Sequence, residues 1–326
     1  MQAMTWIGVL AAVTSLGSYS QASQDAPAKP VRAADVIALS RLTADARVAV
    51  ALQPGAVATD DALWTLVAGG AARVDAKTNA VSPPVGLPSP GCASLVVAFG
   101  SVWAPLCGAG TVARVDVKSN AVTAPLTLQL ADAAGRIATA VGSVWVASDA
   151  KGIVSRVDPD TNDVVAEVFV AAVPSSVVFG EDALWVTSAT GDVVTRVNPH
   201  TSAVVEAVKV GPAPGRVAVG EGGVWTLNRG DGSVSRIDPK TNKVVATISA
   251  EGAGAGEIAV GEGSVWISAP GLPLVRIDPK TNRVAQRFTG DAGGAVLVAH
   301  GSVWVAAAPG VTWRLDPKLV AAMRPE

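Results

Sequence analysis

Residues 214–250, PGRVAVGEGGVWTLNRGDGSVSRIDPKTNKVVATISA, contain one complete unit of a sequence repeat. Short runs of Val, Thr and Ile alternate with clusters of Gly, Asp, Pro and Asn, which is the pattern of short strands joined by tight turns. RVAVG predicts an inner strand, GVWTL a second, SVSRID a third and KVVATI an outer strand. The unit therefore predicts a four-stranded antiparallel sheet.

The tryptophan of this unit returns along the chain at a nearly constant spacing. Successive copies are 39, 42, 40, 40, 41 and 38 residues apart, and seven of the nine tryptophans belong to the series: Trp64, Trp103, Trp145, Trp185, Trp225, Trp266 and Trp304. A second landmark, Arg followed by an aliphatic residue and Asp or Asn, occurs in the same seven units. Four strands at a period near forty residues are typical of propeller blades. We therefore predict an all-β, seven-bladed β-propeller over residues 46–326.

The residues that recur in every unit are explained by the requirements of the fold. Apolar residues on both sides of the tryptophan indicate a strand that is buried on both faces, so we expect the tryptophans to lie in the core between blades. In the DPKTN turn, Asp accepts backbone amides, Pro presets φ and Asn tolerates a left-handed backbone. We expect the arginine two residues before this Asp to pair with acidic residues of the rim.

Ring closure is expected at the two ends of the repeat region. The C-terminal stretch KLVAAMRPE, residues 318–326, is a poor outer strand, whereas ARVAVAL at 46–52 resembles the outer strand KVVATI. The N-terminal strand should therefore complete the last blade and close the ring. Trp313 replaces a small residue of other units and is expected to pack on this incoming segment.

The first residues have the composition of an export signal. WIGVLAAVT at 6–14 is a short apolar run, and Ser20 and Ala22 suit cleavage after Ala22. We predict a signal peptide at 1–22, a linker or N-terminal extension at 23–45, and a periplasmic or secreted mature protein. Residues 35–45 fit either a short docked helix or a frayed tail. The apolar run is too short to span a bilayer comfortably, and no other stretch qualifies, so no membrane span is expected in the mature form.

Charge limits the partners that the protein can take. The net charge is −2, the sequence pI is about 5.8, and the basic residues are scattered. This argues against nucleic acid and anionic membranes. A closed propeller has no edge that requires a partner, so a monomer is expected.

Departures from the repeat gather on the face that carries the loops between second and third strands and the connections between blades. Cys92 and Cys107 belong to one blade and should lie at one end of it. In an exported protein they predict a disulfide. A reactive dithiol and a zinc pair are the alternatives.

Charged residues also depart from the repeat at the start of inner strands. Arg136, Arg216 and Glu257 each follow a glycine and should point toward the entrance of the central channel. Loop residues are expected around them: Asp149, Lys151, Arg229 and Asp231. Because arginine offers forked donors, a ligand site for a carboxylate or phosphate, made by Arg136, Arg216, Glu257, Arg229 and Asp231, is one interpretation. A solvated rim with internal ion pairs, including one between Arg216 and Glu257, is the other.

The motif set GSVWV, RIDPKTNKVVATI and VAVGEGSVWI resembles the repeats of YVTN or YncE-like bacterial propellers and those of the streptogramin B lyase family. The lyase resemblance implies a metal-assisted elimination with histidines and a glutamate at the funnel mouth. His200 and His300 instead occupy copies of the DPKTN and GEGS turns, on the opposite rim, so no catalytic residue and no metal ligand is assigned.

These observations predict an exported, non-enzymatic binding or scaffold propeller. It would recognise a small anionic ligand, or an envelope or extracellular protein, on its loop-rich face, and no cofactor is expected. The alternative is a metal-dependent carbon–oxygen lyase or a lactonase-type enzyme. DNA binding, which the YncE-like resemblance also implies, conflicts with the charge of the chain.

Overall fold

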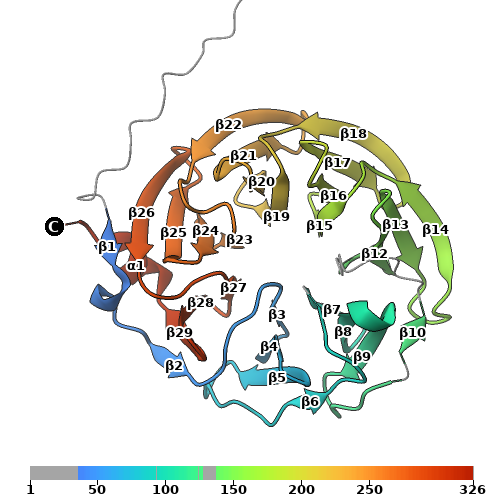
Figure 1. Ribbon diagram of the computed structural model, residues 1–326, viewed down its shortest axis with the longest axis horizontal. Coiled ribbons are helices and arrows are strands. Elements are labelled where there is room, and N and C mark those ends of the chain that lie inside the picture. The colour runs from blue at the N-terminus through green and yellow to red at the C-terminus, as the bar shows by residue number, and fades with distance from the viewer. Residues whose placement is uncertain (1–35, 93, 124, 128–136, 326) are drawn as a thin grey trace, which may run out of the picture. The chain divides into compact units, whose positions relative to one another are not determined.

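The chain folds into a ring of seven β-sheets, as a computed structural model shows (Figure 1). The structure describes residues 36–92, 94–123, 125–127 and 137–325. The predicted signal peptide at 1–22 and the part of the predicted extension up to residue 35 lie outside this set. Each sheet contains one blade of four antiparallel strands, with the first strand of the blade next to the ring centre, and the sheet of blade 6 carries one further strand in parallel. The predicted seven-bladed propeller is confirmed.

The blades follow one another in chain order, with the inner strand first in each. Blade 1 contains β3 (Val57–Ala58), β4 (Ala62–Val67), β5 (Gly70–Asp75) and β6 (Val85–Gly86). Blade 2 contains β7 (Val96–Ala98), β8 (Ser101–Leu106), β9 (Thr111–Asp116) and β10 (Leu126–Thr127), with the 3-10 turn η3 (Cys107–Ala109) after β8. Blade 3 contains β11 (Ile137–Ala140), β12 (Ser143–Asp149), β13 (Ile153–Val157) and β14 (Val164–Phe169).

The remaining blades keep the same order. Blade 4 contains β15 (Pro174–Gly180), β16 (Ala183–Ser188), β17 (Val193–Asn198) and β18 (Ala203–Lys209). Blade 5 contains β19 (Pro214–Gly220), β20 (Gly223–Asn228), β21 (Ser233–Asp238) and β22 (Lys243–Ser249). Blade 6 contains β23 (Glu257–Gly261), β24 (Ser264–Ala269), β25 (Leu272–Asp278) and β26 (Arg283–Thr289). Blade 7 contains β27 (Val296–Ala299), β28 (Ser302–Ala308) and β29 (Val311–Leu315) from the C-terminal part of the chain.

The fourth strand of blade 7 comes from the N-terminal part of the chain, as predicted. Strand β2 (Ala46–Val48) pairs antiparallel with β29. The Arg47 guanidinium lies 4.8 Å from the centre of the Trp313 ring, which confirms the expected packing of Trp313 on the incoming segment. After β29 the chain forms helix α1 (Pro317–Ala322). The carboxylate of its N-cap residue, Asp316, accepts a hydrogen bond from the backbone N–H of Lys318 at 2.7 Å. The C-terminal residues therefore do not compete for the place of β2.

A further N-terminal element, which the sequence did not indicate as a strand, lies on blade 6. Strand β1 (Ile37–Ala38) pairs in parallel with β26, and the single 3-10 turn η2 (Leu39–Arg41) follows it. The side chains of Ile37, Leu39 and Leu42 are buried in the same apolar cluster as Phe288. Residues 36–45 are thus docked through a short strand and one turn rather than through a regular helix.

All seven repeat tryptophans lie in the core between blades, with 0% exposure. Trp225 packs on Ile258, Val265 and Ile277 of the next blade. In six blades the guanidinium of the Arg motif lies over the ring of its own tryptophan, at 4.3 to 6.0 Å from the ring centre. The tryptophans therefore fill the space between blades, as expected.

The arginines of the repeat join neighbouring blades. Arg236 donates from Nη1 to the Pro279 carbonyl at 2.7 Å and to Asn282 Oδ1 at 2.8 Å. Arg196 contacts the turn of blade 5 in the same way, and Arg314 contacts that of blade 1 across the ring closure. The prediction of acidic rim partners is right for Arg73, whose Nη2 lies 2.8 Å from Asp61, and wrong for these three. A backbone carbonyl and an Asn amide can accept from a guanidinium without the desolvation of a second charge.

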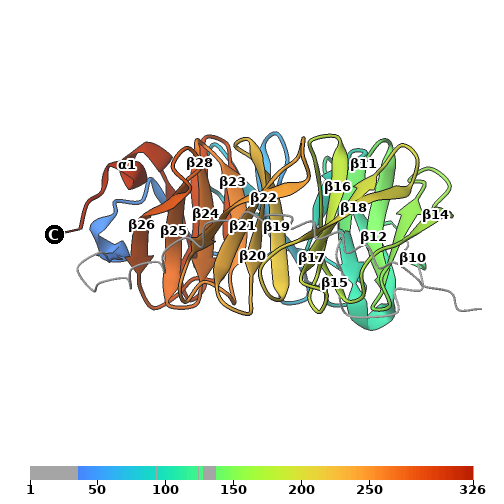
Figure 2. The same ribbon diagram turned by 90° about the horizontal axis from the view of Figure 1, so that it is seen from above.

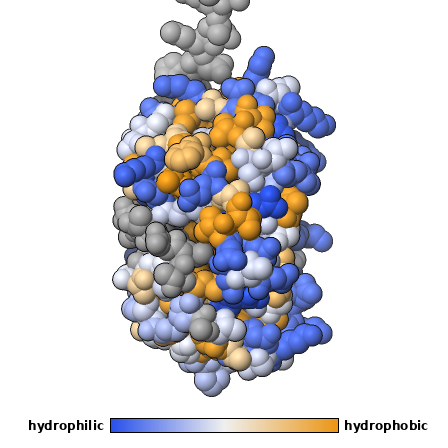
Figure 3. Space-filling model, turned by 90° about the vertical axis from the view of Figure 1, so that its right-hand side faces the viewer, coloured by the Kyte–Doolittle hydropathy of each residue, from blue (hydrophilic) through white to orange (hydrophobic). Residues whose placement is uncertain are grey.

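The outer surface of the ring alternates apolar and charged side chains. Figure 3 shows apolar patches on one flank, interrupted by hydrophilic residues. Val164, Val165 and Phe169 of the outer strand β14 are exposed to 44%, 55% and 71%. Seen from the side, the loops between strands project from both ends of the ring (Figure 2). Over the described ranges, no helix has both the length and the apolar character that a membrane crossing demands.

Candidate functional site

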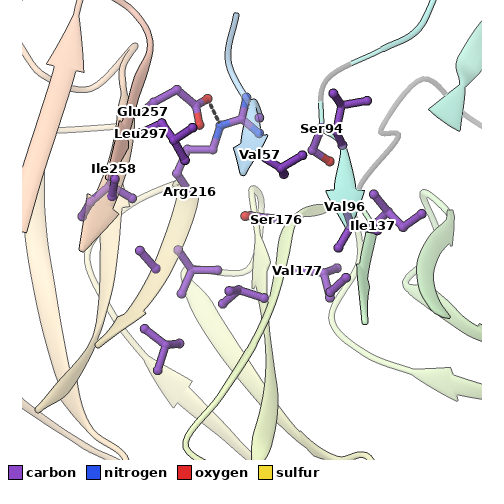
Figure 4. Close-up of a pocket in the computed structure, with 18 of the residues that line it drawn as sticks. Val57, Ser94, Val96, Ile137, Ser176, Val177, Arg216, Glu257, Ile258 and Leu297 are labelled. Carbon is purple, nitrogen blue, oxygen red and sulfur yellow. Dashed lines mark ion pairs between the residues drawn. The ribbon is translucent and has the colours of Figure 1, made fainter. Parts of the chain in front are cut away.

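The inner strands of the seven blades surround a central cavity of approximately 530 Å³. Most of its lining side chains are aliphatic, among them Val57, Val96, Ile137, Val177 and Ile258 (Figure 4). The polar side chains in the lining are Ser94, Thr139, Ser176, Arg216 and Glu257. The cavity thus combines mainly aliphatic side chains with a few polar ones, and its volume falls in the range of small-molecule sites.

Arg216 and Glu257 form an ion pair at the mouth of this cavity (Figure 4). Arg216 lies near the start of β19 and Glu257 at the start of β23, so adjacent blades present the two side chains at the same end of the ring. Nε of Arg216 contacts Oε1 of Glu257, and the side chains are only 12% and 13% exposed. The predicted pair is present, but it is largely buried rather than part of a solvated rim.

The terminal nitrogens of Arg216 lie outside its ion pair with Glu257. Its contact with Glu257 engages Nε, and no acceptor among the described residues pairs with Nη1 or Nη2. A guanidinium can donate five hydrogen bonds, and its forked geometry matches a carboxylate or a phosphate. A guanidinium whose terminal nitrogens have no acceptor among the described residues has the geometry to receive a carboxylate or a phosphate.

The electrostatics of Arg216 reflect its position. Burial lowers the pKa of Arg216, the carboxylate of Glu257 opposes this change, and the nearby charge of Arg229 adds to the lowering. A guanidinium stays protonated at neutral pH even after such a shift. Among the described residues, the charges of Arg216, Arg229 and Glu257 thus act together at this point of the mouth.

A glycine allows Arg229 to lie beside this pair. A Cβ added at Gly215 would lie 2.3 Å from Nε of Arg229, so any side chain there would displace the arginine. Arg229 itself is exposed. Asp231, in the same loop, accepts a hydrogen bond from the Ser233 backbone N–H at 2.9 Å. Arg229 thus belongs to the surroundings of Arg216, whereas Asp231 shapes its own turn.

Arg216 also lines a second cavity, of approximately 450 Å³, on the loop side of the channel. The other lining residues come from the opposite part of the ring: Gln53, Pro54, Leu66, Val67, Ala68 and Gly91. The guanidinium of Arg216 therefore lies between an outer hollow formed by loops of blades 1 and 2 and the inner channel. Sequence reasoning missed this wall, because the residues that form it carry no charge.

The other predicted site residues have separate positions. Arg136 lies outside the described residues, so its predicted role is not addressed by the structure. The carboxylate of Asp149 accepts from the Lys151 backbone N–H at 2.6 Å and closes the loop after β12. The structure thus brings Arg216, Glu257 and Arg229 together and gives Asp149 and Asp231 local roles in their turns.

The two cysteines lie at the same end of blade 2. The Cys92 backbone N–H donates to the Pro105 carbonyl at 2.9 Å, close to the end of β8, and Cys107 begins η3 immediately after that strand. The side chain of Cys107 is not among those that the structure describes, so the disulfide stays a prediction.

The two histidines occupy the turns that the repeat predicts. The His200 backbone N–H donates to Asn198 Oδ1 at 2.8 Å, and its ring Nε2 lies 3.2 Å from Asp182 Oδ1 on the exposed rim. His300 is the first residue of the turn between β27 and β28, with φ of 52°. Among the described side chains, no three His, Cys, Asp or Glu residues lie close enough together to hold a metal ion.

Comparisons with known proteins give structural relatives only. No family model matches the chain, and no curated protein matches its sequence. A selenomethionine virginiamycin B lyase from Staphylococcus aureus matches with a TM-score of 0.70 and 16% identity, over 82% of this chain and 97% of that one. A streptogramin B lyase matches with a TM-score of 0.67 and 19% identity, over 82% and 94%.

A third solved structure belongs to a protein with a different name. BamB from Moraxella catarrhalis matches with a TM-score of 0.60 and 14% identity, over 82% of this chain and 83% of that one. At these identities the likeness concerns the arrangement of the blades and not the site, because one fold hosts many functions. The chain is thus similar in fold to a virginiamycin B lyase, a streptogramin B lyase and BamB.

Proposed function

We propose that the protein is an exported binding propeller that holds a small anionic ligand at the loop-side mouth of its central channel. The observation that carries this proposal is the Arg216 side chain, which is only 12% exposed and keeps its terminal nitrogens without an acceptor among the described residues. Solvent reaches these terminal nitrogens, so an anion can replace water there and accept hydrogen bonds from both of them.

The position of the pair supports ligand binding rather than a purely structural role. Ion pairs that only stabilise a blade would lie within it or between neighbouring blades at the rim, as Arg73 and Asp61 do. Arg216 and Glu257 instead meet where two cavities adjoin. Glu257 fixes the guanidinium from one side, so the donors point to a defined place before a ligand arrives.

The test is a thermal-unfolding screen with anions of different size, followed by calorimetry. Acetate, benzoate, octanoate, citrate and glucose 6-phosphate are added to the mature protein, with Arg216→Gln as the site variant. Arg283→Gln is the matched control, because Arg283 is an exposed arginine on β26, at the outside of blade 6. A ligand at a hundred times its Kd stabilises the native state by about 2.7 kcal/mol, which is easily measured.

The proposal predicts that at least one anion raises the Tm of the native protein and of Arg283→Gln, but not that of Arg216→Gln. The proposal is wrong if no anion raises the Tm of the native protein, or if the same anion raises the Tm of Arg216→Gln equally. Mass spectrometry of the protein from the cell envelope tests export separately, because cleavage after Ala22 would leave Ser23 as the first residue.

A further inference from the structure

The side chains that line the central cavity restrict the class of anion that the site would bind. Sugar phosphates and polycarboxylates carry polar groups over their whole surface and need many polar partners. The cavity next to Arg216 offers aliphatic side chains along its length, from Val57 and Val96 to Ile258 and Leu297. In Figure 4 these side chains lie around and beyond the ion pair, while the charged groups occupy one end.

The charges at the mouth match a ligand with a single negative group. Among the described residues, Glu257 pairs with Arg216 at Nε and offsets part of the positive charge of Arg216 and Arg229. A ligand with two or three carboxylates would place additional negative charge close to Glu257, without a second described arginine to receive it in the cavity lining. A lone carboxylate can take the two terminal nitrogens of Arg216 as a forked pair.

The volume fits a ligand with a substantial apolar body. Approximately 530 Å³ lie on the channel side of Arg216, and small-molecule sites of about 300–1,000 Å³ bury most of a drug-sized ligand. Burial of an aliphatic body against Val, Ile and Leu would supply most of the affinity, since the ion pair alone contributes little net free energy at a partly hydrated mouth.

From these observations we infer that the ligand is an amphiphilic monocarboxylate, with its carboxylate on Nη1 and Nη2 of Arg216 and its apolar body in the central channel. The inference rests on the proposed function, because it names the ligand class of the same site. It accounts for two features together: an arginine whose terminal nitrogens have no acceptor in the part of the chain that the structure describes, and a channel lined by aliphatic side chains that begins beside it.

The experiment is an isothermal titration of straight-chain alkanoates from acetate to decanoate, at neutral pH and below their micelle concentrations. We expect the affinity to increase by about fourfold for each added methylene, which corresponds to about 0.8 kcal/mol per methylene, until the channel is filled. The heat-capacity change should become more negative along the series, because this is the marker of apolar burial. In Arg216→Gln the whole series should bind at least tenfold more weakly.

A second variant tests the place of the apolar body. Ala259 lines the cavity on β23, so Ala259→Leu should reduce the space and weaken octanoate at least tenfold while acetate changes little. Ala203→Leu, at an exposed alanine of outer strand β18, is the matched control and should leave all affinities unchanged. If Ala259→Leu fails to fold, the chain-length series on the native protein still tests whether the ligand has an apolar body that is buried on binding.

The outcomes separate this inference from the proposed function. Binding that depends on Arg216 but does not increase from acetate to octanoate, or that favours citrate, would overturn the amphiphile and leave the anion site standing. Binding of octanoate that is unchanged in Arg216→Gln and in Ala259→Leu would place the ligand elsewhere and overturn both. The absence of any anion effect would overturn both as well.

Discussion

Nη1 of Arg236 in blade 5 lies 2.8 Å from Oδ1 of Asn282 in blade 6, while the same guanidinium lies 4.8 Å from the centre of the Trp225 ring. One side chain therefore joins the core of its own blade to the turn of the next. The Asn of the DPKTN turn has two roles, because it also adopts the left-handed φ of 55° that the turn requires. This contact explains why Arg and Asn recur at a fixed separation within the repeat.

Arg236→Lys should destabilise the protein although the charge is kept. An ammonium group cannot donate to both the Pro279 carbonyl and Asn282 while it lies flat on the tryptophan. We expect a loss of about 1–2 kcal/mol in the free energy of unfolding, measured by urea denaturation. Arg283→Lys, at an exposed position of β26, is the control and should change the stability by less than about 0.5 kcal/mol. Equal effects of the two substitutions would show that the inter-blade contact carries no stability.

Val141→Asn should stabilise the protein. Val141 has a φ of 48° in the two-residue turn before β12, a conformation that a β-branched residue adopts only under strain and that Asn tolerates. Relief of this strain is expected to contribute about 1 kcal/mol, or about 2 °C in Tm by calorimetry. Val165→Asn, on the exposed outer strand β14, removes a comparable apolar side chain from an extended position and should not stabilise. A lower Tm for Val141→Asn would mean that the valine side chain makes a contact worth more than the strain.

The rim turns should make stability depend on pH in the acidic range. Hydrogen bonds from the backbone N–H of Lys240 and from Thr241 lower the pKa of Asp238 from its ordinary value of 3.8. Because the folded pKa lies below the unfolded one, the stabilisation is complete above pH 3.8 and is lost as the pH falls through the folded pKa.

Asp238→Asn tests this dependence. Asn keeps an oxygen acceptor but does not titrate, as Asn198 already shows by accepting from the His200 backbone N–H at 2.8 Å. The Tm difference between the native protein and Asp238→Asn should favour Asp at pH 7 and shrink toward zero at pH 2. If the Tm difference is the same at pH 7 and pH 2, the contribution of Asp238 comes from the geometry of its hydrogen bonds and not from its charge.

Glu257→Gln should increase the affinity for carboxylate ligands. The amide removes the negative charge that competes for Arg216 but keeps a similar shape. We expect a gain of about five- to tenfold in affinity for octanoate by calorimetry, which corresponds to about 1–1.4 kcal/mol. A loss of affinity would instead show that Glu257 holds the guanidinium in the orientation that the ligand needs.

Removal of the N-terminal strand should open the ring. A chain that begins at residue 53 lacks β1, η2 and β2, and with them the buried side chains of Ile37, Leu39, Leu42, Val48 and Leu52. Each such side chain stabilises the fold by about 1.5–3 kcal/mol, so the truncated chain should unfold or self-associate through blade 7. A chain that begins at residue 36 keeps these elements and should match the full chain in Tm and in its size by light scattering. A truncated chain that melts like the longer one would show that β2 is dispensable.

The sequence by itself determined the architecture, because each blade repeats the same local information. The spacing of Trp225 and its counterparts, the DPKTN turns and the resemblance of ARVAVAL to an outer strand predict seven blades and the closure by β2. Strand order within a blade follows from short loops, and burial of the tryptophans follows from apolar residues on both sides of them. Strand order and tryptophan burial depend on residues that are close together in the chain, so the repeat pattern of the sequence is enough to predict them.

Only the tertiary structure decided which residues meet across the ring. The pair of Arg216 and Glu257 was one of two interpretations of the sequence, but nothing in the sequence indicated that Gln53 and Leu66 reach the same mouth from the opposite part of the ring. The partners of Arg236 in the next blade and the parallel pairing of β1 with β26 are of the same kind. Such contacts arise from the closure of the ring, which brings side chains together that are about forty or more residues apart in the sequence. The sequence shows each charged residue as a departure from the repeat, but the cavity that Arg216 lines exists only after all seven blades have closed.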